Sequence, residues 1–223
     1  RAEAHHVHAE DGDEDVPEDV VGASLNPAGR FLDGREYTSV VAEAAGLKGA
    51  KIYEGWPVTG MVWQEDRVIG VRSGTDVLLA DIVINSAGAW AGRLDPKLTH
   101  PVFPLHGQAM SVQEPPTKLR HNLYRVGGHG YITPRADGRV VVGATGDQWG
   151  YQKKITAEGI TYLGQIIPYV LPCLEGLPVL DIWSGFRPGS PDGLATIGPD
   201  PRAAGGGYLW AAGHSSNGMN QAP

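Results

Sequence analysis

The sequence is poor in cysteine, in long apolar runs and in excess positive charge. Its single cysteine, Cys173, cannot form a disulfide within the chain and fits a reducing compartment such as the cytoplasm. No apolar run approaches the roughly 18–20 residues that a membrane-spanning helix needs, and the acidic start is unlike a secretory signal peptide. These absences argue against a disulfide scaffold or a membrane protein and favour a globular chain of 223 residues, 41% of them hydrophobic.

The net charge of −7 is concentrated in the first 19 residues, which hold one arginine and eight acidic residues. The rest of the chain carries equal numbers of basic and acidic residues. This near-neutral body argues against a nucleic-acid partner. We interpret residues 1–19 as an acidic tail or loop. His5, His6 and His8 lie in it, but their spacing matches no closed set of metal ligands, so no metal site is predicted.

Two segments combine a buried strand with a turn of small residues. Asp81–Asn85 is a continuous apolar run, which is typical of a parallel strand covered on both faces, and Ser86–Gly92 follows it directly. Tyr208–Ala212 and Gly213–Gly218 repeat this arrangement near the end. Because small residues let a bulky group approach the backbone, we predict that both turns face one crevice and bind a nucleotide-like ligand.

Shorter strands and two helices are predicted around and between these segments. Alternating, β-branched or aromatic residues predict strands at Val20–Leu25, Lys51–Tyr53, Val58–Gln64, Arg67–Arg72, Pro101–Val112, Gly130–Pro134 and Arg139–Ala144. Helices are predicted over Glu36–Leu47 and Thr156–Leu171, the latter with Thr156 as N-cap. A mostly antiparallel sheet with one helix is therefore inserted between two pieces of an α/β sheet.

Four stretches follow one another in a characteristic order. They are Val83–Trp90, Gly130–Arg135 with Gly138–Thr145, Trp183–Gly193, and Ala212–Gly218. Together, over nearly all of residues 20–223, they resemble the FAD-dependent oxidoreductases of the D-amino-acid oxidase family, and most closely the bacterial glycine oxidases of thiamine biosynthesis. The resemblance implies an α+β fold in which an α/β FAD-binding domain is interleaved with an antiparallel-sheet substrate domain.

The resemblance also implies domain boundaries. Residues 20–33 and 101–182 correspond to the substrate domain, and residues 34–100 and 183–223 to an incomplete FAD-binding domain. The family holds the FAD pyrophosphate with a strand, a GxGxxG turn and a helix. The 223 residues contain no GxGxxG sequence, and they stop where the family's last helix begins. We therefore expect that these residues alone do not hold FAD at stoichiometry.

Three residues are implied to bind the substrate. Arg187 would grip a substrate carboxylate bidentately, as a guanidinium can and an ammonium cannot; the alternative is a structural arginine paired with Asp181 or Asp192. Tyr131 would donate its hydroxyl to the same carboxylate, or would only anchor a core. Gly146 stands where glycine oxidases have methionine, which leaves room for substrates larger than glycine unless Trp149 or Tyr151 fills it.

The resemblance places a larger set of residues against the cofactor. Backbone amides near the start of the C-terminal helix would stabilise the negative charge of the reduced flavin, and Ser216 stands there where glycine oxidases have arginine. The implied FAD-binding residues are Val58, Ala87, Gly88, Trp90, Gly185, Gly213, His214, Ser216, Asn217, Gly218 and Met219. The alternative for each is ordinary turn and sheet packing.

The implied activity is oxidative deamination of glycine or another small amino acid or secondary amine, with O₂ as electron acceptor and hydrogen peroxide as product. The flavin does the chemistry, so no catalytic side chain is assigned, and His106, His129 and His214 are interpreted as surface or core histidines and not as catalysts. Two alternatives stay open. One is a sarcosine-oxidase-like or D-amino-acid-dehydrogenase-like flavoenzyme, and the other is a non-catalytic fragment or partner subunit without FAD. A homo-oligomer is compatible with the implied activity and with both alternatives.

Overall fold

The computed structural model describes residues 5–7, 17, 19–20, 22–26, 31–128 and 130–221. Contacts divide the chain into two compact units. The first consists of Arg1–Tyr37, Gly107–Gly146 and Lys153–Gly185, and the second of Thr38–His106, Asp147–Gln152 and Phe186–Pro223. The predicted domain boundaries at 33/34, 100/101 and 182/183 stay predictions. The substrate and cofactor roles of the two units remain predictions.

A four-stranded sheet with the order β10-β7-β9-β8 belongs mainly to the first unit, and the first residues of β7 and the last residues of β10 belong to the second unit. Its strands are β7 (Phe103–Gln113), β8 (Tyr131–Pro134), β9 (Arg139–Gly143) and β10 (Val179–Gly189). β9 pairs antiparallel with both β7 and β8, and Gly143 lies opposite Ala109 on one side and Tyr131 on the other. The predicted antiparallel strands are confirmed, whereas β10 was not predicted.

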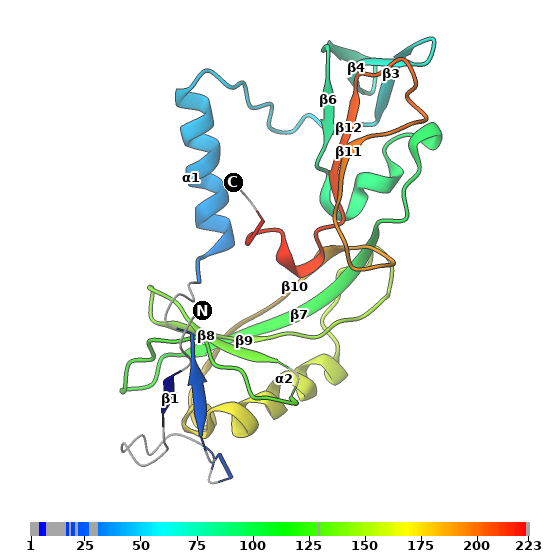
Figure 1. Cartoon of the computed structure of the whole chain (residues 1–223). Helices are drawn as coiled ribbons and strands as arrows, with labels where there is room; N and C mark the ends of the chain where they lie inside the picture. Colours follow the sequence, from blue (N-terminus) through cyan, green and yellow to red (C-terminus); the bar gives the residue numbers. More distant parts are fainter. Residues whose placement is uncertain are drawn as a thin grey trace. The chain divides into compact units, whose positions relative to one another are not determined.

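Helix α2 (Ala157–Val170) packs against this sheet (Figure 1). The predicted N-cap is confirmed, because the Thr156 hydroxyl accepts a hydrogen bond of 3.1 Å from the Gly159 amide. The helix buries apolar side chains against β7, β8 and β9, and the short helix η4 (Pro172–Leu174) follows it. The buried core of this unit consists of Met110, Val112, Ile132, Val140, Val142, Leu163, Ile166, Ile167, Leu171 and Leu174.

The second unit contains two three-stranded sheets. One has the order β3-β4-β5 and is an antiparallel meander of Gly60–Gln64, Arg67–Ser73 and Asp76–Leu79. The other has the order β11-β12-β6, from Thr196–Pro199, Tyr208–Ala212 and Val83–Asn85. Its β6 runs parallel to β12. The residues just before β12 contact both sheets, because the Val68 amide of β4 donates to the Gly206 carbonyl at 3.1 Å and the Val83 amide of β6 donates to the Gly207 carbonyl at 2.9 Å.

Helix α1 (Gly34–Leu47) confirms the predicted helix and begins two residues earlier. Asp33, which the sequence reading overlooked, caps it: its carboxylate accepts hydrogen bonds from the amides of Arg35 (2.9 Å) and Glu36 (3.2 Å). In the part of the chain that the structure describes, no helix has the length and apolar character needed to cross a membrane.

Several local predictions are wrong. In the predicted acidic tail or loop of residues 1–19, β1 (His5–Val7) is a strand that pairs antiparallel with β2 (Ala23–Leu25), and most of the other residues of that segment lie outside the described ones. Lys51–Tyr53 forms no strand. The expected cover on both faces of the β6 run is also absent among the described residues, because Ile84 is 60% exposed. An apolar sequence specifies a strand, but not how many faces neighbouring elements cover.

Candidate functional site

A cavity of about 410 Å³ lies in the second unit where β6 ends. Predicted cofactor residues Val58, Ala87 and Trp90 line it, together with Asn85 and Ser86 of the strand-to-turn junction. Its volume lies in the range of small-molecule sites. The structure therefore brings together three of the predicted cofactor residues, which come from separate segments of the sequence.

Asn85 holds the turn at this cavity. It is 3% exposed, and its side-chain amide donates to the Ala91 carbonyl (2.9 Å) and to the Tyr208 hydroxyl (2.7 Å). Its side-chain oxygen accepts from the Ala87 amide at 3.1 Å. Burial raises the pKa of Tyr208 to about 12, so the hydroxyl stays neutral. Asn85 was not predicted as a site residue, although a polar residue at the end of an apolar strand could have indicated this role.

The small-residue turn after Asn85 takes the shape of a short helix, η2 (Gly88–Arg93). Gly88 begins it with a φ of +56°, a left-handed conformation that glycine adopts without penalty. A Cβ built at Gly88 meets no atom within 4 Å. The indole of Trp90 is 47% exposed although it lines the cavity. The turn thus combines an open backbone with an accessible aromatic ring, which suits contact with a flat cofactor.

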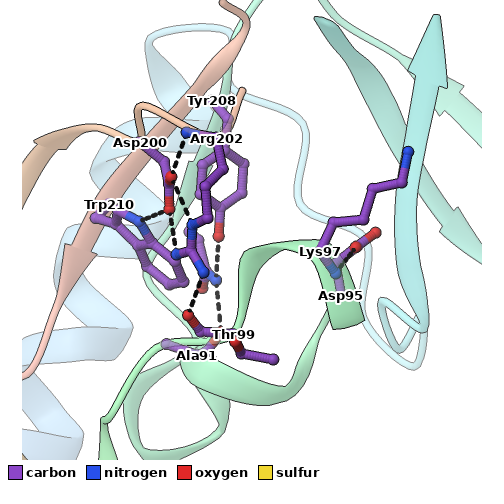
Figure 2. A network of polar contacts seen from close by, with 9 residues as sticks. Ala91, Asp95, Lys97, Thr99, Asp200, Arg202, Tyr208 and Trp210 are labelled. Carbon is purple, nitrogen blue, oxygen red and sulfur yellow. Dashed lines mark hydrogen bonds and ion pairs between the residues drawn. The ribbon is translucent and has the colours of Figure 1, made fainter. Parts of the chain in front are cut away.

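A buried carboxylate supports the strands behind this turn (Figure 2). Asp200 is 3% exposed and accepts hydrogen bonds from the Arg202 guanidinium (2.9 and 2.6 Å) and from the Trp210 indole (2.7 Å). The Arg202 guanidinium also donates to the Thr99 carbonyl at 2.7 Å. These contacts lower the pKa of Asp200 to about 2, and the hydrogen bonding by the Arg202 side chain has the largest effect.

A second carboxylate connects the following turn to the meander. Asp95 caps the short helix η3 (Pro96–Leu98) by accepting from the Lys97 amide at 2.8 Å (Figure 2). It also accepts from the Trp63 indole at 3.0 Å. The Lys97 ammonium lies 4.8 Å from the centre of the Trp63 ring. Asp95 and Lys97 therefore attach the residues after η2 to Trp63 of β3.

The segment after β12 differs from its prediction. The expected beginning of a C-terminal helix is the short helix η5 (Ser215–Asn217), preceded by Gly213 with a φ of +78° and by His214. The Asn217 amide donates to the His214 carbonyl at 2.9 Å, so it is already used within the segment. The cofactor roles of Gly213, His214, Ser216, Asn217, Gly218 and Met219 stay predictions.

The candidate substrate residues of the first unit are Tyr131, at the start of β8, and Gly146, three residues after the end of β9. The Tyr131 ring crosses the backbone of Gly143, where a built Cβ would approach the ring to 2.5 Å. The Tyr124 ring, 67% exposed, lies 6.0 Å from that of Tyr131. Gly146 is exposed and a Cβ built there meets no atom within 4 Å, which is also true of Gly185 in β10.

Arg187 lies on β10, is partly buried and belongs to the second unit. The alternative is that Arg187 pairs with Asp181 or Asp192. Each of these carboxylates accepts a hydrogen bond from a nearby backbone amide. Asp181 accepts from the Ile182 amide at 2.8 Å, and Asp192 accepts from the Leu194 amide at 3.0 Å. The role of Arg187 stays a prediction.

The histidines occupy different surroundings. His106 is fully buried, with its ring 5.0 Å from that of Trp149 and 5.8 Å from that of Phe186, and its Nδ1 lies 3.7 Å from an Asp147 carboxylate oxygen. His129 and His8 lie outside the described residues. Among the residues that the structure describes, no group of three or more His, Cys, Asp or Glu side chains could hold a metal ion.

Comparisons with known proteins agree with this arrangement. The family model described as FAD dependent oxidoreductase matches residues 2–223. Glycine oxidase of Pseudomonas putida is 38% identical over 188 residues, which are 83% of this chain and 50% of that protein. The bifunctional protein ThiO/ThiG of Synechocystis is 36% identical over 210 residues, 92% of this chain and 31% of that protein. The crystal structure of glycine oxidase from Bacillus cereus matches with a TM-score of 0.82 and 26% identity, covering 92% of this chain and 57% of that one.

These matches define a class of flavin-dependent redox enzymes that share an α+β fold. The chain belongs to the FAD dependent oxidoreductase family, which confirms the family resemblance and the fold class. It spans between about a third and three fifths of the length of the relatives it matches.

Proposed function

We propose that the protein oxidises glycine or another small amino acid or secondary amine with FAD, forming an imine or 2-oxo acid and hydrogen peroxide. Membership of an FAD-dependent family and 38% identity to a glycine oxidase support the proposal. When bound, FAD would accept a hydride from the α-carbon of the substrate and pass the electrons to O₂. The chain itself would bind and orient both molecules.

The observation that carries the proposal is the cavity at the end of β6. Parallel strands of α/β sheets bind ligands beyond their carboxyl ends, and here Asn85 fixes the backbone while Ala87 and Trp90 line the space. Val58 contributes from the segment before β3. The lining is small, apolar and aromatic, which fits a part of FAD. We infer that Val58, Ala87, Gly88 and Trp90 hold the cofactor.

Arg187 and Tyr131 are the proposed carboxylate ligands. A carboxylate that enters a water-poor flavin site needs a paired cation, because an unpaired buried charge is strongly destabilised. Arg187 supplies a planar donor pair on a strand, and Tyr131 supplies a hydroxyl on a ring held over Gly143. The open space at Gly146 supports substrates with a side chain. The Tyr151 hydroxyl donates to the Ala89 carbonyl at 2.7 Å, so we do not expect the Tyr151 ring to fill this space.

Replacement of Arg187 tests the proposal. In the enzyme extended with a GxGxxG-containing segment and loaded with FAD (below, the FAD-loaded enzyme), Arg187→Ala should lower kcat/KM for D-alanine by the equivalent of roughly 3–5 kcal/mol, the scale for breaking a buried charge pair. The kcat/KM for ethylamine, which lacks the carboxylate, should change little. The measurement is peroxide production with each substrate, together with flavin absorbance near 450 nm to confirm that cofactor loading is unchanged.

A matched control is Arg139→Ala, which removes a surface guanidinium that pairs with Asp137 at 2.6 Å. It should leave both substrates unaffected, since exposed pairs contribute little. Equal losses for D-alanine and ethylamine in Arg187→Ala would show that Arg187 is structural. If the unaltered, FAD-loaded enzyme oxidises neither amino acids nor amines, the proposed function itself is wrong.

A further inference from the structure

A cluster of aromatic rings in the second unit connects the proposed cofactor turn with the strand that carries Arg187. The Trp90 ring lies 5.7 Å from the Tyr151 ring and 5.7 Å from the Phe186 ring. The Tyr151 and Phe186 rings are 6.1 Å apart. The three rings therefore contact one another pairwise, although they come from segments separated by dozens of residues.

Tyr151 is held by its hydroxyl as well as by its ring. Besides its two ring contacts, its hydroxyl donates to the Ala89 carbonyl at 2.7 Å. The Arg93 guanidinium lies 4.7 Å from the centre of the ring, a distance at which a cation is attracted to an aromatic face. Both Ala89 and Arg93 belong to η2. Tyr151 is thus bound to η2 through its hydroxyl and its ring, and to β10 through Phe186.

Phe186 determines how Arg187 is presented. The two residues are neighbours on β10, and successive side chains of a strand point to opposite faces. The Phe186 ring is held on one face by Trp90, Tyr151 and the buried His106, whose ring is 5.8 Å away. Arg187 consequently leaves the strand on the other face. Movement of the Phe186 ring would turn the strand at this position and, with it, the direction of the Arg187 side chain.

We propose that Tyr151 is a positioning residue, which sets the orientation of Arg187 relative to the cofactor turn by fixing Phe186 against η2. The inference rests on the proposed function, because it takes Arg187 as the carboxylate ligand. A bidentate guanidinium pair tolerates little angular error, and small displacements of a binding group reduce rates steeply. Tyr151 touches neither substrate nor reacting atoms in this role.

The test compares two substitutions in the FAD-loaded enzyme. Tyr151→Leu removes the ring and the hydroxyl, and it should raise the Kd of acetate about fivefold to tenfold, as expected for the loss of aromatic contacts and one hydrogen bond. Acetate is a non-reacting carboxylate whose binding is read from the visible spectrum of the flavin. The KM for D-alanine should rise in parallel with little change in kcat, and ethylamine oxidation should not change.

Tyr151→Phe keeps the ring contacts and loses only the hydrogen bond to Ala89. It should recover most of the acetate affinity, leaving a Kd about twofold to threefold above that of the unaltered enzyme. This variant also keeps the inference testable if Tyr151→Leu fails to fold. The matched control is Tyr169→Leu, since Tyr169 also has an arginine over its ring, with Arg125 at 4.1 Å. Acetate binding should be unaffected by that change.

Two results would overturn the inference. One is an unchanged acetate Kd in both Tyr151 variants, and the other is an equal loss for D-alanine and ethylamine, as a general structural role would give. Failure of the proposed function looks different. In that case the unaltered, FAD-loaded enzyme oxidises neither D-alanine nor ethylamine, whereas an unchanged acetate Kd in Arg187→Ala shows only that Arg187 does not bind the carboxylate.

Discussion

Single buried polar residues hold the second unit in the conformation that its cavity requires. Asn85 uses both amide hydrogens and its oxygen, on Ala91, Tyr208 and Ala87. Asp200 uses both carboxylate oxygens, on Arg202 and Trp210. A buried polar atom is costly unless it is paired, so each of these side chains specifies one arrangement of its neighbours. Their substitution should affect stability before it affects chemistry.

Asp200 gives a prediction about pH. Its folded-state pKa of about 2 lies below the ordinary value of 3.8, so its contribution to stability is complete above pH 3.8 and is lost as the pH falls toward 2. The shift corresponds to about 2 kcal/mol. The free energy of unfolding of Asp200→Asn should therefore lie below that of the unaltered chain at neutral pH, and the difference should narrow by about that amount between pH 4 and pH 2.

Denaturant unfolding monitored by tryptophan fluorescence across this pH range measures the effect. A difference between the two proteins that stays constant from pH 4 to pH 2 would contradict the assignment of a paired, ionised Asp200.

At the scale of elements, the contact between α2 and the sheet depends on one buried glutamine. Gln108 of β7 is fully buried; its side-chain oxygen accepts from the Thr156 amide at 2.8 Å, and its side-chain amide donates to the Thr156 hydroxyl at 3.3 Å. Its backbone amide donates to the Thr145 hydroxyl at 3.0 Å. The first turn of α2 approaches so closely that a Cβ at Gly159 would lie 2.2 Å from the Gln108 amide. The helix start is thereby tied to the sheet.

Gly159→Ala tests this contact. The added methyl overlaps a side chain that is held at both ends, so the substitution should destabilise the chain by about 1–3 kcal/mol, the cost of overpacking. Gly164→Ala in the same helix is the control, since a Cβ there meets nothing within 4 Å and should add about 0.5–1 kcal/mol through helix propensity. Thermal unfolding should move in opposite directions for the two. Equal shifts would mean that Gln108 can move aside.

At the scale of the whole molecule, each of the two compact units is built from three segments, and the segments of the two units alternate along the chain. Residues 2–223 match the FAD dependent oxidoreductase family, and a 188-residue match covers 50% of the Pseudomonas putida glycine oxidase. The cavity residues of β6 and its turn lie in this matched part, whereas a GxGxxG sequence does not occur in it. Backbone amides of such a turn bind the pyrophosphate of a dinucleotide.

We predict that the 223 residues alone bind FAD well below stoichiometry. The missing pyrophosphate contacts should cost several kcal/mol, and each 1.4 kcal/mol lowers the affinity about tenfold. The measurement is the flavin absorbance near 450 nm of the purified chain, set against the protein concentration. A yellow protein with one FAD per chain would contradict the prediction, whereas restored loading after addition of a GxGxxG-containing segment would support it.

Much of the element pattern follows from the sequence because it is local. Thr156 lies directly in front of α2, and the β-branched and aromatic residues of β8 and β9 are joined by a short turn, so these elements depend little on distant packing. The strand β10 was not predicted, because its Gly and Pro residues resemble a loop and only pairing across the sheet makes it a strand.

The sequence by itself determined the family, the α+β class and the residues that deserve a functional test, since short motifs in a fixed order carry that information. Only the tertiary structure decided that Val58, Ala87 and Trp90 line one cavity, that Asn85 holds its turn, and that Tyr151 joins η2 to the strand of Arg187. These are contacts between residues tens of positions apart. Loop closure and side-chain packing set them, and neither is written in the local pattern of the chain.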